Sequence, residues 1–146
     1  DLAVVGDVAF MVVVAGLAWR EVLSGSTWRN TPVCLLVSVL TIANLVFLVQ
    51  SNPELGQRLG LVAIALLISL IGGRVVPSYT RNWLAKQNVS DLPAPVGTYD
   101  KLCLIVLLAA LVTWLISPNS IAAGLLMLVA ALSHAIRLAR WRCVAT

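Results

Sequence analysis

Long apolar stretches separated by short polar segments occur five times along the chain. Each is close to the roughly 20 residues that an α-helix needs to cross about 30 Å of hydrocarbon. Neither Leu61–Ile71 nor Leu102–Val112 alternates between apolar and polar residues, as the strands of membrane barrels do. Because backbone groups in lipid must form their hydrogen bonds within the segment, the pattern predicts helices. We expect about five membrane helices, at residues 2–23, 33–50, 59–79, 101–117 and 121–141.

The polar segments between these stretches contain residues that interrupt helices. Ser51-Asn52-Pro53 follows the second stretch, and Pro93-Ala94-Pro95-Val96-Gly97 breaks the long third loop. Ser117-Pro118-Asn119-Ser120 is short enough to make the fourth and fifth helices an antiparallel hairpin. The predicted fold is therefore all-α, a multi-pass transmembrane helix bundle. We expect residues 1–146 to form a single transmembrane module of a larger membrane protein, because the chain starts at Asp1 without an initiator Met.

The composition agrees with a membrane protein. Hydrophobic residues make up 60% of the chain and charged residues 11%, whereas soluble domains have about 45–50% apolar and about 25% charged residues. The expected surroundings are therefore the lipid bilayer. The net charge of +4 does not indicate a nucleic-acid partner, because the basic residues stand at the ends of apolar stretches.

If the chain changes sides of the membrane at each predicted crossing, almost all of its positive charges fall on the same side. Nine basic residues then fall on one side, and only Arg58 falls on the other. The nine are Arg20, Arg29, Arg74, Arg81, Lys86, Lys101, Arg137, Arg140 and Arg142. The positive-inside rule places their side in the cytoplasm. We expect a bacterial inner-membrane protein whose N-terminus lies outside and whose C-terminus is cytoplasmic, as far as this segment is concerned.

The end of the third stretch combines Gly73, Arg74, Pro77, Arg81 and Asn82. The two arginines are seven positions apart, so they share a face if the helix continues past Pro77. Proline removes a backbone donor, so a kink or a thinner helix is expected there. One interpretation is that both arginines extend to the cytoplasmic interface as topology anchors. The other is a buried polar cluster: an anion or haem-propionate site, or a structural ion pair in the bundle.

Two polar residues, Asp7 and Asn44, lie within the apolar stretches. Asp7 would cap a helix N-terminus at the outer interface, or it would serve as a proton-relay or gating carboxylate. Asn44 falls near mid-membrane, where an amide usually hydrogen-bonds another helix. A substrate or water path is the alternative for Asn44.

His134 is the one histidine of the chain. A metal site needs several converging ligands, so His134 is a weak candidate for a haem or copper ligand. The chain has no GxSxG, HExxH, P-loop or GxGxxG motif. A complete catalytic apparatus is therefore not expected in these residues, and whether the protein is an enzyme stays open.

The stretch from Gly72 to Leu84, GGRVVPSYTRNWL, resembles the signature of the NnrS family. The resemblance implies a larger bacterial membrane protein that contains haem and copper and acts in the nitric oxide response, in denitrification and in tolerance to nitrosative stress. The His-rich segments of that family are absent here, so its metal ligands are expected outside this segment. Only the motif around Arg74, Pro77, Arg81 and Asn82 is transferred, with no catalytic step assigned.

Two further functions are compatible with the residues. A transporter or channel segment would use Asp7, Asn44 and a third helix broken by Pro77. A structural membrane module would hold partner subunits through the small-residue face of Ala65, Ser69 and Gly73. In either case the expected partners are other helices of the same protein or the other copies of a homo-oligomer.

Overall fold

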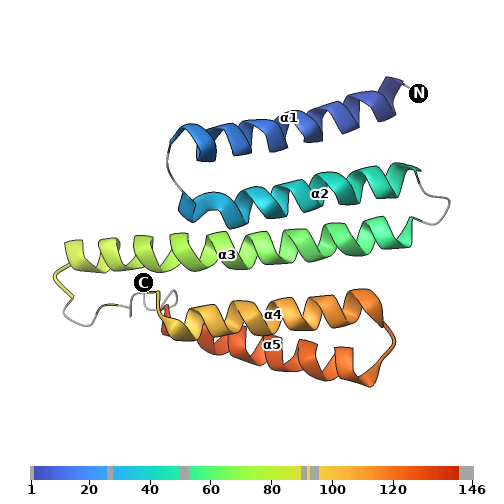
Figure 1. Cartoon of the computed structure of the whole chain (residues 1–146). Helices are drawn as coiled ribbons and strands as arrows, with labels where there is room; N and C mark the ends of the chain where they lie inside the picture. The colour runs from blue at the N-terminus through green and yellow to red at the C-terminus, as the bar shows by residue number, and fades with distance from the viewer. Residues whose placement is uncertain (1, 26–27, 50–52, 90–91, 93–95, 142–146) are drawn as a thin grey trace. The chain divides into compact units, whose positions relative to one another are not determined.

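Helices make up nearly all of the protein in the computed structural model (Figure 1), which describes residues 2–25, 28–49, 53–89, 92 and 96–141. No strand occurs in these ranges. In chain order the elements are α1 (Leu2–Ser24), the short 3₁₀ helix η1 (Trp28–Asn30), α2 (Thr31–Val49), α3 (Glu54–Lys86), α4 (Thr98–Ile116) and α5 (Ile121–Arg140). The all-α fold with about five long helices is therefore confirmed.

The largest difference from the expected boundaries is in α3. This helix has 33 residues, whereas the apolar pattern predicts only 59–79. Its first and last turns are polar, so a hydropathy pattern leaves them out although the backbone continues as helix. The helix also runs through Pro77 without interruption. The proline therefore does not divide α3 into two helices.

Four helices in the described part of the chain are long and apolar enough to cross a membrane. These segments are Trp28–Val49, Glu54–Lys86, Thr98–Ile116 and Ile121–Arg140. Large apolar side chains such as Phe10, Ile68 and Leu132 are more than half exposed, as expected for surfaces that face acyl chains. The crossing by α1, and the alternation of sides that depends on it, stay predictions.

The chain divides into two compact units, Asp1–Leu67 and Ile68–Thr146. In the first unit, α1 and α2 lie side by side and antiparallel (Figure 1). Trp19 Nε1 donates to Ser38 Oγ at 2.9 Å, and Thr41 Oγ1 donates to Met11 O at 3.3 Å. Hydrogen bonds between helices are therefore what join α1 to α2, in addition to packing.

The beginning of α3 packs on α2 in the same unit through small residues. A Cβ atom at Gly56 would lie 2.5 Å from the backbone N of Phe47, and one at Gly60 would lie 4.0 Å from Ala43 Cβ. Only glycine fits at position 56, because the two backbones approach so closely there.

The second unit contains the rest of α3 together with α4 and α5. A short turn joins α4 to α5, which form an antiparallel hairpin (Figure 1). Ala110, Ala123 and Ala130 are almost fully buried, so small side chains allow the helices to approach closely. The predicted hairpin is therefore present. That residues 1–146 act as one module of a larger protein stays a prediction.

Candidate functional site

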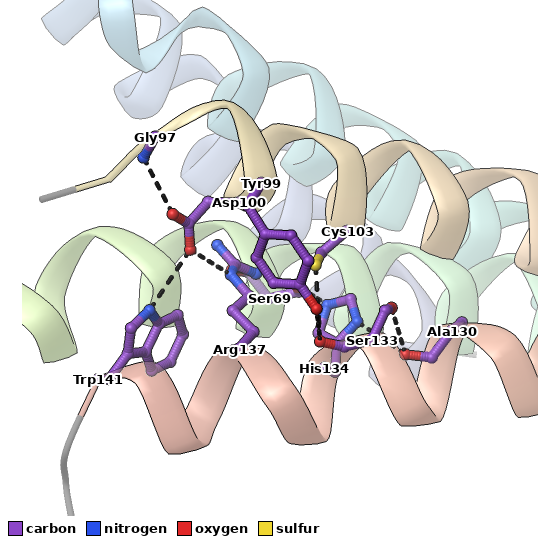
Figure 2. Close-up of polar contacts among 10 residues, drawn as sticks. All are labelled: Ser69, Gly97, Tyr99, Asp100, Cys103, Ala130, Ser133, His134, Arg137 and Trp141. Atoms are coloured by element: carbon purple, nitrogen blue, oxygen red, sulfur yellow. Dashed lines mark hydrogen bonds and ion pairs between the residues drawn. The ribbon is translucent and has the colours of Figure 1, made fainter. Parts of the chain in front are cut away.

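Arg137 lies in the last turn of α5, and its side chain is buried, with 2% of its surface exposed. Its Nε donates to Asp100 Oδ1 at 2.9 Å (Figure 2). Asp100, in the first turn of α4, is also buried. The pair joins the two arms of the hairpin at the end away from the turn. An arginine and a carboxylate are each very unfavourable in an apolar interior when unpaired, so each requires the other.

The carboxylate of Asp100 has two further donors. Oδ2 accepts from the backbone N–H of Gly97 at 3.0 Å, and Oδ1 accepts from Trp141 Nε1 at 3.4 Å. The Trp141 ring also lies against the guanidinium, whose central carbon is 4.9 Å from the ring centroid. The bond to Gly97 caps α4, so the same side chain begins the helix and holds the arginine.

Arg137 also reaches α3. Its Nη1 donates to Ser69 Oγ at 3.0 Å and to the Ser69 carbonyl at 3.3 Å. A Cβ atom built at Gly73, one turn further along α3, would overlap Nη2 of Arg137, whereas nothing lies within 4 Å of one built at Gly72. Gly73 is therefore the position where α3 makes room for the guanidinium. Ser69 and Gly73 are the small-residue face that the sequence pattern assigns to helix contacts.

His134 lies beside Ser69 in Figure 2. Its Nε2 is 2.7 Å from Ser69 Oγ, and its Nδ1 is 3.0 Å from the carbonyl of Ala130. A carbonyl only accepts, so Nδ1 carries the proton. Arg137 donates to the same Ser69 Oγ, so the serine hydroxyl connects the histidine to the arginine. Both ring nitrogens of His134 are therefore engaged in hydrogen bonds within the protein.

A second set of contacts joins α4 to α5 one turn away. Tyr99 Oη donates to the Ser133 carbonyl at 3.1 Å, and Cys103 Sγ lies 3.6 Å from the same oxygen. The Arg140 guanidinium lies over the Tyr99 ring, 4.6 Å from its centroid. These contacts, together with Arg137, hold the open end of the hairpin together.

The motif residues at the end of α3 have different environments. Gly73 and Pro77 are buried, Arg74 is half-buried, and Arg81 and Asn82 are exposed. Gly73 contacts the buried arginine, so it is the motif residue that the described contacts place in the cluster. An anion or haem-propionate site at Arg74 and Arg81 stays a prediction.

The two polar residues predicted in the first unit meet each other. Asn44 Nδ2 donates to Asp7 Oδ2 at 2.8 Å, which is the interhelical hydrogen bond expected of a membrane asparagine. The helix-cap interpretation of Asp7 is wrong, because α1 begins at Leu2 and Asp7 lies in its second turn. The side chain of Asp7 is directed to α2 instead.

Sequence reasoning missed Asp100 and recognised Arg137 only as a topology charge. A signal was present in the spacing. The two residues are 37 positions apart, and their midpoint falls in the turn between Pro118 and Asn119. Residues equidistant from the turn of an antiparallel hairpin lie at the same level. Asp7 and Asn44 are also 37 positions apart, around the turn that follows α1.

Metal-ligating side chains do not gather in the described part of the chain. No group of three or more His, Cys, Asp or Glu side chains comes together among them. Both ring nitrogens of His134 are hydrogen-bonded, and the buried thiol of Cys34 lies 3.3 Å from the Ala18 carbonyl. That haem and copper, which the sequence resemblance implies, are bound outside this segment stays a prediction.

A family model described as NnrS protein matches residues 1–146, the whole length of the chain. Searches of curated proteins and of solved structures returned no match.

Proposed function

The chain belongs to the NnrS family, and we propose that it forms part of an integral membrane protein that acts in the nitric oxide response. This protein supports tolerance to nitrosative stress during denitrification. The family match over the whole chain carries this proposal. The four helices able to cross a membrane support its insertion in a membrane. We place it in the bacterial inner membrane with the N-terminus of the segment outside and its C-terminus in the cytoplasm, which requires α1 to cross as a fifth helix.

The role of these residues within such a protein is to build the helical scaffold. The buried pair of Arg137 and Asp100 fixes the two arms of the hairpin at one register and connects them to α3 through Ser69. A buried ion pair of this kind favours one arrangement over others. Haem and copper, if the protein holds them as its family does, would be bound by residues outside the described set.

Complementation in a bacterium that lacks the gene tests the proposal. The host is grown with a nitric oxide donor, without the gene, with the full gene, and with an Arg137→Leu variant. We expect the full gene to restore growth, and the variant to restore it less because the scaffold is weakened. Equal growth with and without the gene would contradict the proposed role.

An absorption spectrum of the purified protein tests the cofactor part separately. We expect a Soret band, and we expect His134→Gln to leave its intensity unchanged because Nε2 of His134 is engaged by Ser69. A band lost only in this variant would make His134 a haem ligand and would contradict the hydrogen-bond assignment.

The hydrogen-bonded pair of Asp7 and Asn44 favours a second candidate, a transporter or channel segment. The unbroken course of α3 through Pro77 removes one argument for it. Uptake into proteoliposomes distinguishes this function from the first. A module that holds partner subunits is less supported, since Ser69 and Gly73 contact Arg137 of the same chain.

A further inference from the structure

A groove of about 320 Å³ lies in the first unit between α1, α2 and the first turns of α3. Its lining is largely apolar and includes Met11, Leu40, Phe47 and Leu48. A volume of this size is in the range of sites that hold small organic molecules, roughly 300–1,000 Å³. The groove is thus large enough for a ligand with an apolar body.

One carboxylate stands in this apolar lining. Asp7 is the one charged residue among the groove residues, and its Oδ2 accepts from Asn44 Nδ2 at 2.8 Å. Its Oδ1 accepts no hydrogen bond, and it forms no ion pair, within the described ranges. Arg58 follows the lining residue Gln57 but is bound to Glu54 at 2.8 Å. The groove therefore presents a negative charge that lacks a counter-ion.

The second unit shows how this chain neutralises a buried acid. Asp100 is buried on the candidate membrane helix α4, is neutralised by Arg137 and has donors on both of its oxygens, whereas Asp7 is exposed. Asp7 has no such ion pair within the described ranges, so its exposed Oδ1 is open to a cationic donor from the groove. A bare divalent ion is disfavoured, since such ions require more oxygen ligands than one carboxylate and two amides provide.

We propose that this groove binds an organic amine, a molecule with one ammonium group and an apolar body. The ammonium donates a charge-assisted hydrogen bond to Asp7 Oδ1, Asn44 holds the carboxylate in place, and the apolar body lies against Met11, Phe47 and Leu48. Burial of the apolar body adds affinity in proportion to its area. This inference is independent of the role in the nitric oxide response.

Binding of dansylcadaverine to the full-length protein tests the proposal. This fluorescent probe has one primary ammonium on an apolar frame, and its N-acetyl derivative is neutral and of similar shape. Binding is measured by fluorescence anisotropy in maltoside micelles, which contain no ammonium group. We expect the charged probe to bind about tenfold more tightly than the neutral one. Equal binding of the two probes would overturn the proposal.

Two variants and a matched control locate the site. Asp7→Asn removes the charge and should abolish the preference for the charged probe, whereas Glu54→Gln removes a carboxylate outside the groove and should preserve it. Gly60→Leu fills the groove without altering Asp7, so it should weaken the binding of both probes. A preference retained in Asp7→Asn, or unchanged binding in Gly60→Leu, would overturn the site.

A lipid headgroup is the competing occupant. Phosphatidylethanolamine added in an amount equimolar to the protein should not displace the charged probe. Displacement at that ratio would identify the occupant as a lipid and would overturn the small-amine proposal.

Discussion

Two arginines in the last turn of α5 show how far environment determines a residue's role. Arg137 and Arg140 are three positions apart and have the same chemistry. Arg137 is buried against Asp100, whereas Arg140 is exposed and lies over the Tyr99 ring. Arg140 has the exposed position that suits a topology charge, the role in which the positive-inside count includes both arginines. Arg137 instead links helices, since its neighbours provide an acid, a serine and a glycine.

The buried ion pair should be far more sensitive to single than to paired replacement. Arg137→Leu or Asp100→Leu alone leaves an uncompensated buried charge, so we expect a loss of about 3–5 kcal/mol in unfolding free energy. The double variant removes both charges and should lose less than either single variant. Unfolding of the purified protein by sodium dodecyl sulfate measures all three. Additive losses would show that the two side chains do not interact.

Gly72 and Gly73 form a matched pair for testing the close approach of Arg137. Gly73→Ala places a methyl group where the guanidinium lies, and we expect a loss of about 1–3 kcal/mol from overpacking. Gly72→Ala meets nothing within 4 Å and should be neutral or slightly stabilising, because alanine favours helix. The same unfolding assay compares them, and equal effects would argue against the described contact.

At the scale of elements, the helices differ in what defines their ends. α5 begins at a side-chain cap, since Ser120 Oγ accepts from the N–H of Ala123 at 3.1 Å. α4 begins where Asp100 accepts from Gly97. α3 continues through Pro77 to Lys86, well past its apolar part. The terminal turns of these helices contain polar residues. Hydropathy alone therefore predicts that a helix is present more reliably than it predicts where the helix begins and ends.

The turn between α4 and α5 offers a second matched pair of residues. Ser120→Ala removes the cap of α5 and should lower the unfolding free energy by about 1 kcal/mol. Ser117→Ala, in the same turn, removes a hydroxyl from an exposed residue whose backbone carbonyl makes the turn contacts. We expect almost no change for Ser117→Ala. Thermal unfolding in detergent, followed by circular dichroism, compares the two, and a larger effect at Ser117 would contradict the assigned cap.

At the scale of the whole molecule, the distribution of charge and apolar surface indicates a bilayer. The candidate membrane helices expose most of their large apolar side chains, and nine of the ten basic residues fall on one predicted side. By the positive-inside rule, the side that holds these nine residues is predicted to face the cytoplasm. The orientation can be checked without knowing the function.

Single cysteines introduced at positions 52 and 86 test the orientation. The apolar helix α3 separates the two positions, so we expect a membrane-impermeant maleimide to label Asn52→Cys from outside intact spheroplasts and Lys86→Cys only after lysis. The native cysteines are replaced by serine in both variants. Labelling of both positions from the same compartment would refute the crossing by α3 and with it the charge assignment.

The sequence by itself determined the number and type of the helices. Apolar runs of this length that lie in lipid must be helical, because a helix forms the hydrogen bonds of all its backbone groups within the segment. It also placed the hairpin turn at Pro118, whereas the position of Asp7 and Asn44 within the membrane stays a prediction. The motif at Gly73 identified the family, because that information is carried by local residue order and needs no folding.

Only the tertiary structure decided which polar side chains meet. Asp100 and Arg137 stand at the ends of two apolar runs, where charges are ordinary, and no local pattern marks either as buried. Their meeting depends on hairpin register, on the glycine at position 73 and on Ser69 in another helix. The contact of Asp7 with Asn44, and the groove that both residues line, likewise depend on how the helices pack. Contacts between distant segments arise from packing, and packing is a property of the assembled helices and not of any single one.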